Sequence, residues 1–121
     1  MISLQNQRVM ERFFELAGFP TVVPAQRIEM QKILLEWQEN RLLVSLLLMI
    51  APGTEQHLLE DILTFCQPEH TLGIPLRTFA LPGILGLAAS APANARAEDV
   101  NTLYQQQYQL LQRYRVAINR S

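Results

Sequence analysis

Helical spacing of apolar residues marks the two ends of the sequence. Residues 3 to 17 repeat apolar side chains every three or four positions behind Ser3, a residue type that caps helices, and Gly18 supplies a left-handed stop. A second helix is predicted from about residue 97 to 118, with acidic residues first and arginines last, as the helix dipole favours. Its seam consists of Val100, Tyr104, Gln107, Leu111, Tyr114 and Ile118. We expect this seam to pack on the chain's own sheet, with a coiled coil as the lesser alternative.

The segment from residue 27 to 50 fits two kinds of structure. As a helix beginning at Pro24, it has an apolar stripe that includes Trp37. As strands, apolar and polar residues alternate from 28 to 38, residues 38 to 40 form a turn, and a further strand runs to Ile50. That last strand is apolar on both faces, so it belongs at the centre of a sheet or beneath a second molecule. The pattern alone leaves both interpretations open.

The second half of the chain predicts a helix and then a hairpin. Residues 54 to 67 carry a wide apolar surface between Thr54, which suits a helix cap, and Pro68, which ends the helix. Two short apolar segments follow, roughly 74 to 81 and 84 to 90, joined at Pro82-Gly83. Because a type II turn at Pro-Gly suits strand twist poorly, we expect a loop longer than two residues.

Composition narrows the class of protein. The 121 residues suit one domain spanning 1–121. Charged residues make up only 17%, against a usual ~25%, which favours a surface partly covered by another protein. The net charge of −1 and the scattered arginines argue against nucleic acid and anionic lipid as partners. The apolar run from Leu42 to Ala51 is far shorter than the ~20 residues of a membrane-spanning helix, so no membrane insertion is expected.

Candidate chemistry is sparse. His57, Cys66 and His70 do not reproduce the four-ligand spacing of a structural zinc site, so we expect no metal and no cofactor. Cys66 follows an apolar helix, where a buried thiol is commoner than a nucleophile, and a lone cysteine suits the cytoplasm. No phosphate loop, nucleophile elbow or dinucleotide fingerprint occurs. The sequence therefore predicts a protein that is not an enzyme.

Several stretches carry a resemblance to a known family. They are "FFELAGFPT", "IEMQKILLEWQENRLLVSLLLM", "EDILTF", "GIPLRTFALPG" and "LYQQQYQLLQRYR". Their order along the chain resembles that of the class I chaperones of type III secretion systems, in particular the SycN-like branch that serves a secreted gatekeeper protein. The resemblance implies an α+β fold: a small single domain of helix, three-strand meander, helix, hairpin and helix, with a twisted antiparallel sheet. It therefore favours strands over residues 27 to 50.

The resemblance also implies a function. Such chaperones catalyse no reaction, form a dimer with a second copy or with a second small chaperone, and hold an extended N-terminal segment of a secreted effector or gatekeeper protein. They work in the bacterial cytoplasm, including the periphery of the secretion apparatus. The implied dimer interface is Leu58, Leu59, Ile62, Leu63, Leu76 and Phe79. The implied cargo surface is Val9, Phe13, Phe14, Met30, Leu35 and Trp37. Each of these residues is also suited to a core.

The charge of the chain departs from the family pattern, and two alternative functions remain open. These chaperones are typically acidic, whereas this chain has a pI of about 6.1, which suits the subunit of a heterodimer whose partner carries the acidic residues. The main alternative is an all-helical regulatory or DNA-binding domain, which needs helices over 24 to 50 and a basic face. The third is a small enzyme that uses Cys66 or the histidines.

Overall fold

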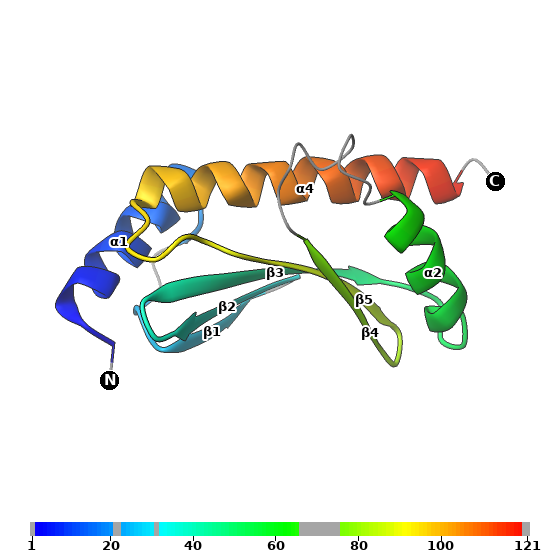
Figure 1. Cartoon of the computed structure of the whole chain (residues 1–121), viewed down its shortest axis with the longest axis horizontal. Helices are drawn as coiled ribbons and strands as arrows, with labels where there is room; N and C mark the ends of the chain where they lie inside the picture. The colour runs from blue at the N-terminus through cyan, green and yellow to red at the C-terminus, as the bar shows by residue number, and fades with distance from the viewer. Residues whose placement is uncertain (1, 21–22, 31, 66–75, 120–121) are drawn as a thin grey trace.

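The chain folds in the predicted order of one helix, three strands, a second helix, two strands and a last helix. The computed structural model describes residues 2–20, 23–30, 32–65 and 76–119. The elements are α1 (Leu4–Ala17), β1 (Arg27–Met30), β2 (Ile33–Gln38), β3 (Arg41–Met49), α2 (Glu55–Phe65), β4 (Arg77–Leu81), β5 (Ile84–Ser90) and α4 (Ala97–Asn119), drawn in Figure 1. The predicted α+β class is confirmed.

The strands form one antiparallel sheet in the order β1-β2-β3-β5-β4. Residues 27 to 49 are therefore strands, and the all-helical alternative is wrong in its fold. The turn between β2 and β3 falls at Glu39 and Asn40, within the expected polar run, and Glu39 adopts a positive φ of 58°. β3 lies at the centre of the sheet, as its two apolar faces required.

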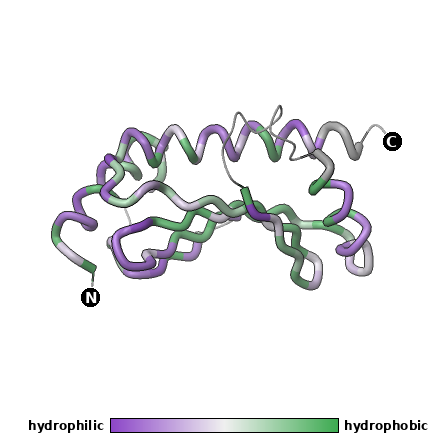
Figure 2. The backbone as a smooth tube through the Cα atoms, viewed as in Figure 1, coloured by the Kyte–Doolittle hydropathy of each residue, from purple (hydrophilic) through white to green (hydrophobic). Residues whose placement is uncertain are grey.

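The helices cover one face of this sheet. α4 packs on β3 and β5 and lies beside α1, while α2 packs on β4 and β5 (Figure 1). In Figure 2 the hydrophobic colour runs through the central strands, whereas the turns of α4 alternate between hydrophilic and hydrophobic colour. The strand residues buried on the helix-covered side include Ile28, Ile33, Leu35, Trp37, Leu42, Val44, Leu46, Leu85 and Leu87. Their alternation along each strand shows that this face of the sheet is the floor of the core.

The ends of α1 follow the sequence prediction. The hydroxyl oxygen of Ser3 accepts a hydrogen bond from the backbone N–H of Asn6 at 3.1 Å, and Gly18 ends the helix with a φ of 77°. A positive φ costs glycine little because it has no Cβ. Both ends of α1 are therefore set by local chemistry.

The seam of α4 packs on the sheet, as predicted. Val100, Leu111 and Tyr114 are buried, while the side chain of Ile118 lies outside the described residues. Gln107 is fully buried between them, and its Nε2 donates to the carbonyl oxygens of Val44 at 2.9 Å and Leu87 at 3.2 Å. One polar side chain thus fixes α4 over the junction of β3 and β5.

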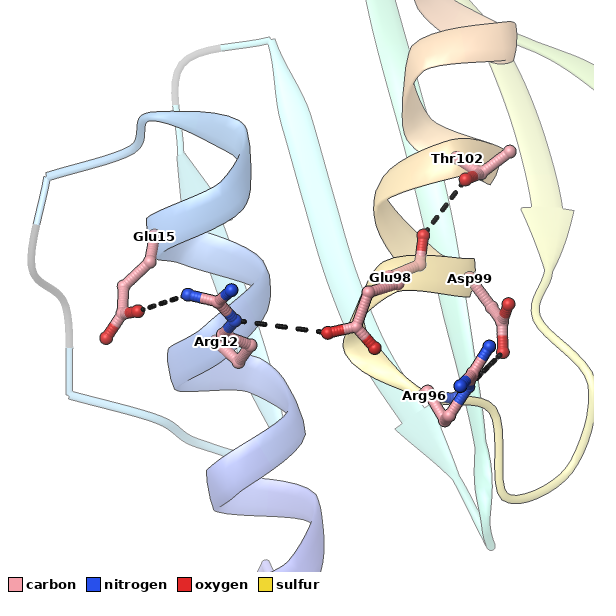
Figure 3. A network of polar contacts seen from close by, with 6 residues as sticks. All are labelled: Arg12, Glu15, Arg96, Glu98, Asp99 and Thr102. Carbon is pink, nitrogen blue, oxygen red and sulfur yellow. Dashed lines mark hydrogen bonds and ion pairs between the residues drawn. The ribbon is translucent and has the colours of Figure 1, made fainter.

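Polar contacts on the surface join the start of α4 to α1 (Figure 3). The Arg12 guanidinium contacts the carboxylates of Glu15 at 3.0 Å and Glu98 at 3.9 Å, and Arg96 contacts Asp99 at 3.6 Å. At least half of each of these side chains is exposed, so each ion pair contributes little to stability. Packing of the apolar seam, rather than these pairs, holds the two helices together.

The loop between β4 and β5 differs from the prediction. Leu81 pairs with Ile84, so the loop contains only Pro82 and Gly83, and the expectation of a longer loop was wrong. Gly83 has a φ of 73°, its N–H donates to Glu55 at 2.8 Å, and its carbonyl accepts from the N–H of Ile50 at 3.0 Å. Contacts from two other parts of the chain therefore stabilise a turn that the hairpin alone disfavours.

Replacing the buried glutamine with an apolar residue tests its role in fixing α4. We expect Gln107→Leu to lower the free energy of unfolding by about 1–3 kcal/mol, because two hydrogen bonds in the core are lost. Urea denaturation measures the change. The matched control Gln105→Leu alters an exposed position of α4; equal losses in both variants would contradict the assignment.

Glu55 makes the stability of this corner depend on pH. The N–H of Gly83, with those of Glu55 itself and Gly53, holds the pKa of the Glu55 carboxyl below its ordinary value of 4.5. A carboxyl whose pKa is lower in the folded state stabilises the fold at pH values above its unfolded-state pKa. This contribution disappears as the pH falls through the folded-state pKa. Glu55→Gln should therefore lower the urea midpoint at pH 7, and its difference from the wild type should shrink below pH 4.5.

The control for this experiment is Glu11→Gln, which changes an exposed carboxylate of α1. It should follow the wild type at every pH. A Glu55→Gln variant that also follows the wild type would show that the carboxylate does not secure the turn.

Candidate interaction surface

The face of the sheet opposite the helices is rich in apolar side chains and carries no helix among the described residues. We call it the open face. The strand register places on it Leu34, Leu43, Ser45, Leu47, Met49, Phe79, Leu81, Ile84, Gly86 and Ala88. Ile62 of α2 joins the same core cluster as Leu85 and Val44, so α2 also belongs to the other side. All the described helices that contact the sheet therefore lie on the side opposite the open face.

A hollow of about 670 Å³ lies on the open face. Leu34, Leu43, Ser45, Phe79 and Ala88 line it, together with Gln38, Arg41, Arg77, Thr78, Ala89 and Ser90. Ser45 and Ala88 are directly opposite one another in the β3–β5 register, and larger side chains flank them. The volume falls in the ~300–1,000 Å³ range of ligand pockets. Small residues at the centre of the sheet and large ones around them therefore create the depression.

The Phe79 ring lies flat on the open face because its cross-strand partner, Gly86, has no side chain. A Cβ built on Gly86 would lie 2.1 Å from Cζ of the Phe79 ring, so the ring packs directly over the glycine. Phe79 and Gly86 are cross-strand partners in β4 and β5. A glycine inside a strand often marks such a close approach, which is the sequence signal that could have located this contact.

A smaller cleft of about 230 Å³ lies between α4 and the β2–β3 pair. Phe19, Tyr104 and Tyr108 line it, with ring centroids 5.3 Å apart for Phe19 and Tyr104 and 6.2 Å apart for Tyr104 and Tyr108. Burial raises the pKa of the Tyr104 hydroxyl, so this tyrosine stays neutral at physiological pH. Lys32 and Arg115 also line the cleft, which therefore combines aromatic rings with two basic side chains.

The residues predicted for the dimer interface lie on α2, just before β4 and on β4, and the structure brings only some of them together, because Phe79 lies on the open face and α2 on the other side of the sheet. Leu63 is 52% exposed, Ile62 is buried, and Leu58, Leu59, Leu76 and Phe79 are partly exposed. The hydroxyl of Tyr114 donates to the carbonyl of Leu58 at 3.2 Å and lies at the same distance from Asp61, which fixes α2 against α4. Leu63 is the member of the set that points most fully to solvent.

The residues predicted for cargo binding lie mostly inside the chain. Phe13, Phe14, Leu35 and Trp37 are buried, and Val9 and Met30 pack partly buried against the same core. The Phe13 ring meets Phe19 and Tyr104 edge-on at 5.6 and 5.8 Å. Cargo binding at these four buried residues stays a prediction that requires α1 or α4 to move. The sequence argument did not single out Leu34 and Leu43, which line the hollow.

The described residues hold no group of three histidine, cysteine, aspartate or glutamate side chains placed to bind a metal ion. Cys66 and His70, weighed above as ligands or as a catalytic pair, lie outside those residues, and His57 is exposed on α2. Within the same ranges no helix is both long and apolar enough to span a membrane.

Sequence comparison identifies the family. The sequence model of the SsaM family matches residues 3–114, which is almost the whole chain. The chain belongs to the SsaM family. This membership places it among small chaperone-like proteins and agrees with the coarser part of the resemblance drawn from the sequence. No curated protein matches the chain.

A solved structure shares the fold of this SsaM family member. It is that of YbjN from E. coli, described as a candidate transcription regulator, with a TM-score of 0.64 and 11% sequence identity. The match covers 93% of this chain and 90% of that chain. At this identity the likeness shows a common fold and nothing about function.

A double-mutant cycle tests the packing of Phe79 over Gly86. Gly86→Ala should cost about 1–3 kcal/mol of unfolding free energy, because the added methyl group displaces the ring. In the Phe79→Ala background the same change should cost much less, since the clash is gone. Urea denaturation of the four proteins gives the coupling energy. Additive effects would show that the ring does not lie on the glycine.

Proposed function

We propose that this SsaM family member is one subunit of a dimeric type III secretion chaperone of the SycN-like branch. It holds the extended N-terminal segment of a secreted effector or gatekeeper protein in the bacterial cytoplasm and catalyses no reaction. Support comes from the chaperone-like family and from a sheet that the described helices cover on one side only.

The apolar open face is the observation that carries this proposal. The solvated face of an antiparallel sheet normally carries polar side chains, so a contiguous exposed apolar surface on that face marks an interaction site. Here Met49, Ile84 and Leu81 are adjacent across β3, β5 and β4, and Met49 and Leu81 are 65% and 51% exposed. An extended polypeptide matches such a surface, because apolar depressions receive alternate side chains and a sheet edge can pair with its main chain.

The proposed dimer contact uses α2 and the residue just before β4. Leu63 supplies an exposed apolar side chain on α2, Leu58 and Leu59 lie on the same helix, and Leu76 lies just before β4. Phe79 of the predicted set belongs to the open face instead. Ile62 supports this contact from beneath, since it is buried in the chain's own core. The partner is a second copy or a second small chaperone, and the low charged content of 17% fits either.

A charged residue at Leu63 tests the dimer. For the chain alone or with its co-purifying small partner, we expect Leu63→Asp to reduce the mass measured by light scattering to that of a single 13.8 kDa chain. The reason is that a carboxylate buried in an apolar contact costs several kcal/mol. The control Leu4→Asp changes another exposed leucine, on α1, and should leave the mass unchanged. A Leu63→Asp protein that folds and keeps the dimer mass would reject this interface.

A further inference from the structure

Acidic and basic side chains occupy different parts of the open face: the carboxylates lie on β1 and β2, and two arginines lie at the hollow. The carboxylates of Glu29 and Glu36 already contact Arg27, at 2.7 and 3.7 Å. These three residues lie along β1 and β2, on the same side of the sheet as the hollow, because Arg27 pairs with Glu36 and Glu29 with Leu34. These two carboxylates therefore share one guanidinium, which leaves the cluster with one excess negative charge.

Arg41 and Arg77 are the two arginines at the hollow. Both line it, whereas no aspartate or glutamate of the described part of the chain does. Among the residues that the structure describes, neither guanidinium lies within 4.0 Å of a carboxylate. Arg77 is opposite Ala88, which is itself opposite Ser45, so the positive charge is adjacent to the floor of the depression. The hollow thus combines an apolar wall with two cations that have no carboxylate partner among the described residues.

We propose that the hollow selects an extended apolar segment that carries a carboxylate side chain, which Arg41 and Arg77 bind. This inference rests on the proposed chaperone function and specifies the class of segment it takes. Apolar side chains of the segment lie against Leu34, Leu43 and Phe79, and the carboxylate accepts charge-assisted hydrogen bonds from the guanidinium groups. Partial exclusion of water by the surrounding leucines strengthens this attraction relative to an open surface.

A second copy of this chain is the less favourable occupant. Its open face presents the same two arginines, and two such faces brought together would place like charges near one another. Glu29 and Glu36 share the one guanidinium of Arg27, so this cluster offsets only one of the two positive charges at the hollow. Charge complementarity therefore favours a different, acidic polypeptide segment.

The test compares synthetic peptides that differ at one position. Peptides of about ten residues, the length of a long strand, alternate leucine and serine between terminal lysines and carry glutamate, glutamine or lysine at the centre. Fluorescence anisotropy gives their affinities for the wild type and for the double variant Arg41→Gln/Arg77→Gln. The control Arg8→Gln/Arg113→Gln removes the same charge from exposed positions of α1 and α4.

For the wild type we expect the glutamate peptide to bind about tenfold more tightly than the glutamine peptide, and the lysine peptide more weakly than both. The double variant should lose this preference and still bind the glutamine peptide, while the control keeps the preference.

Equal affinities for the glutamate and glutamine peptides, or a preference that survives in the double variant, would overturn the charge selection and leave the chaperone proposal standing. Failure of all three peptides to bind would count against both proposals. A changed oligomeric mass in the double variant alone would show that a second copy, rather than cargo, occupies the hollow.

Discussion

The structure depends on one constraint: β3 is apolar on both faces, but the helices that the structure describes cover only one of them. Leu42, Val44 and Leu46 enter the core beneath α4, and the intervening Leu43 and Leu47 face the other way. Neighbouring strands on both sides complete the backbone pairing of β3, so the sheet itself is satisfied. What remains is apolar side-chain surface, and its burial by another polypeptide would be favourable.

The two faces of the sheet differ in how their side chains are held. On the covered face, hydrogen bonds fix the helices and the β4–β5 turn to the strands. Gln107 joins α4 to two strands through buried hydrogen bonds, and Glu55 and Gly83 hold the β4–β5 turn against α2 and β3. The open face has instead a hollow with small residues at its floor, and the arginines at its wall contact no carboxylate among the described residues. Membership of the chaperone-like SsaM family and this asymmetry together support the proposed function.

The sequence predicted the features that neighbouring residues determine, such as helix ends. It did not predict the features that depend on how strands distant in the sequence pair. Ser3 and Gly18 set the ends of α1, but alternation over 27 to 50 suited helix and strand equally until the family resemblance favoured strands. Spacing identified Phe13 and Trp37 as apolar contacts without telling core from cargo surface, because both environments demand the same residue types. The hollow could not be predicted, since Ser45 and Arg77 approach it only through the pairing of β3, β5 and β4.

Solvent exposure of leucine methyl groups tests the one-sided covering most directly. A soluble paramagnetic agent, with methyl NMR as the readout, should broaden the signals of Leu34 and Leu43 in the isolated chain and spare those of Leu35 and Leu42. In the complex purified with its bound polypeptides, the signals of Leu34 and Leu43 should become protected as well. Open-face methyl groups that are already shielded in the isolated chain, or still accessible in the complex, would contradict the account.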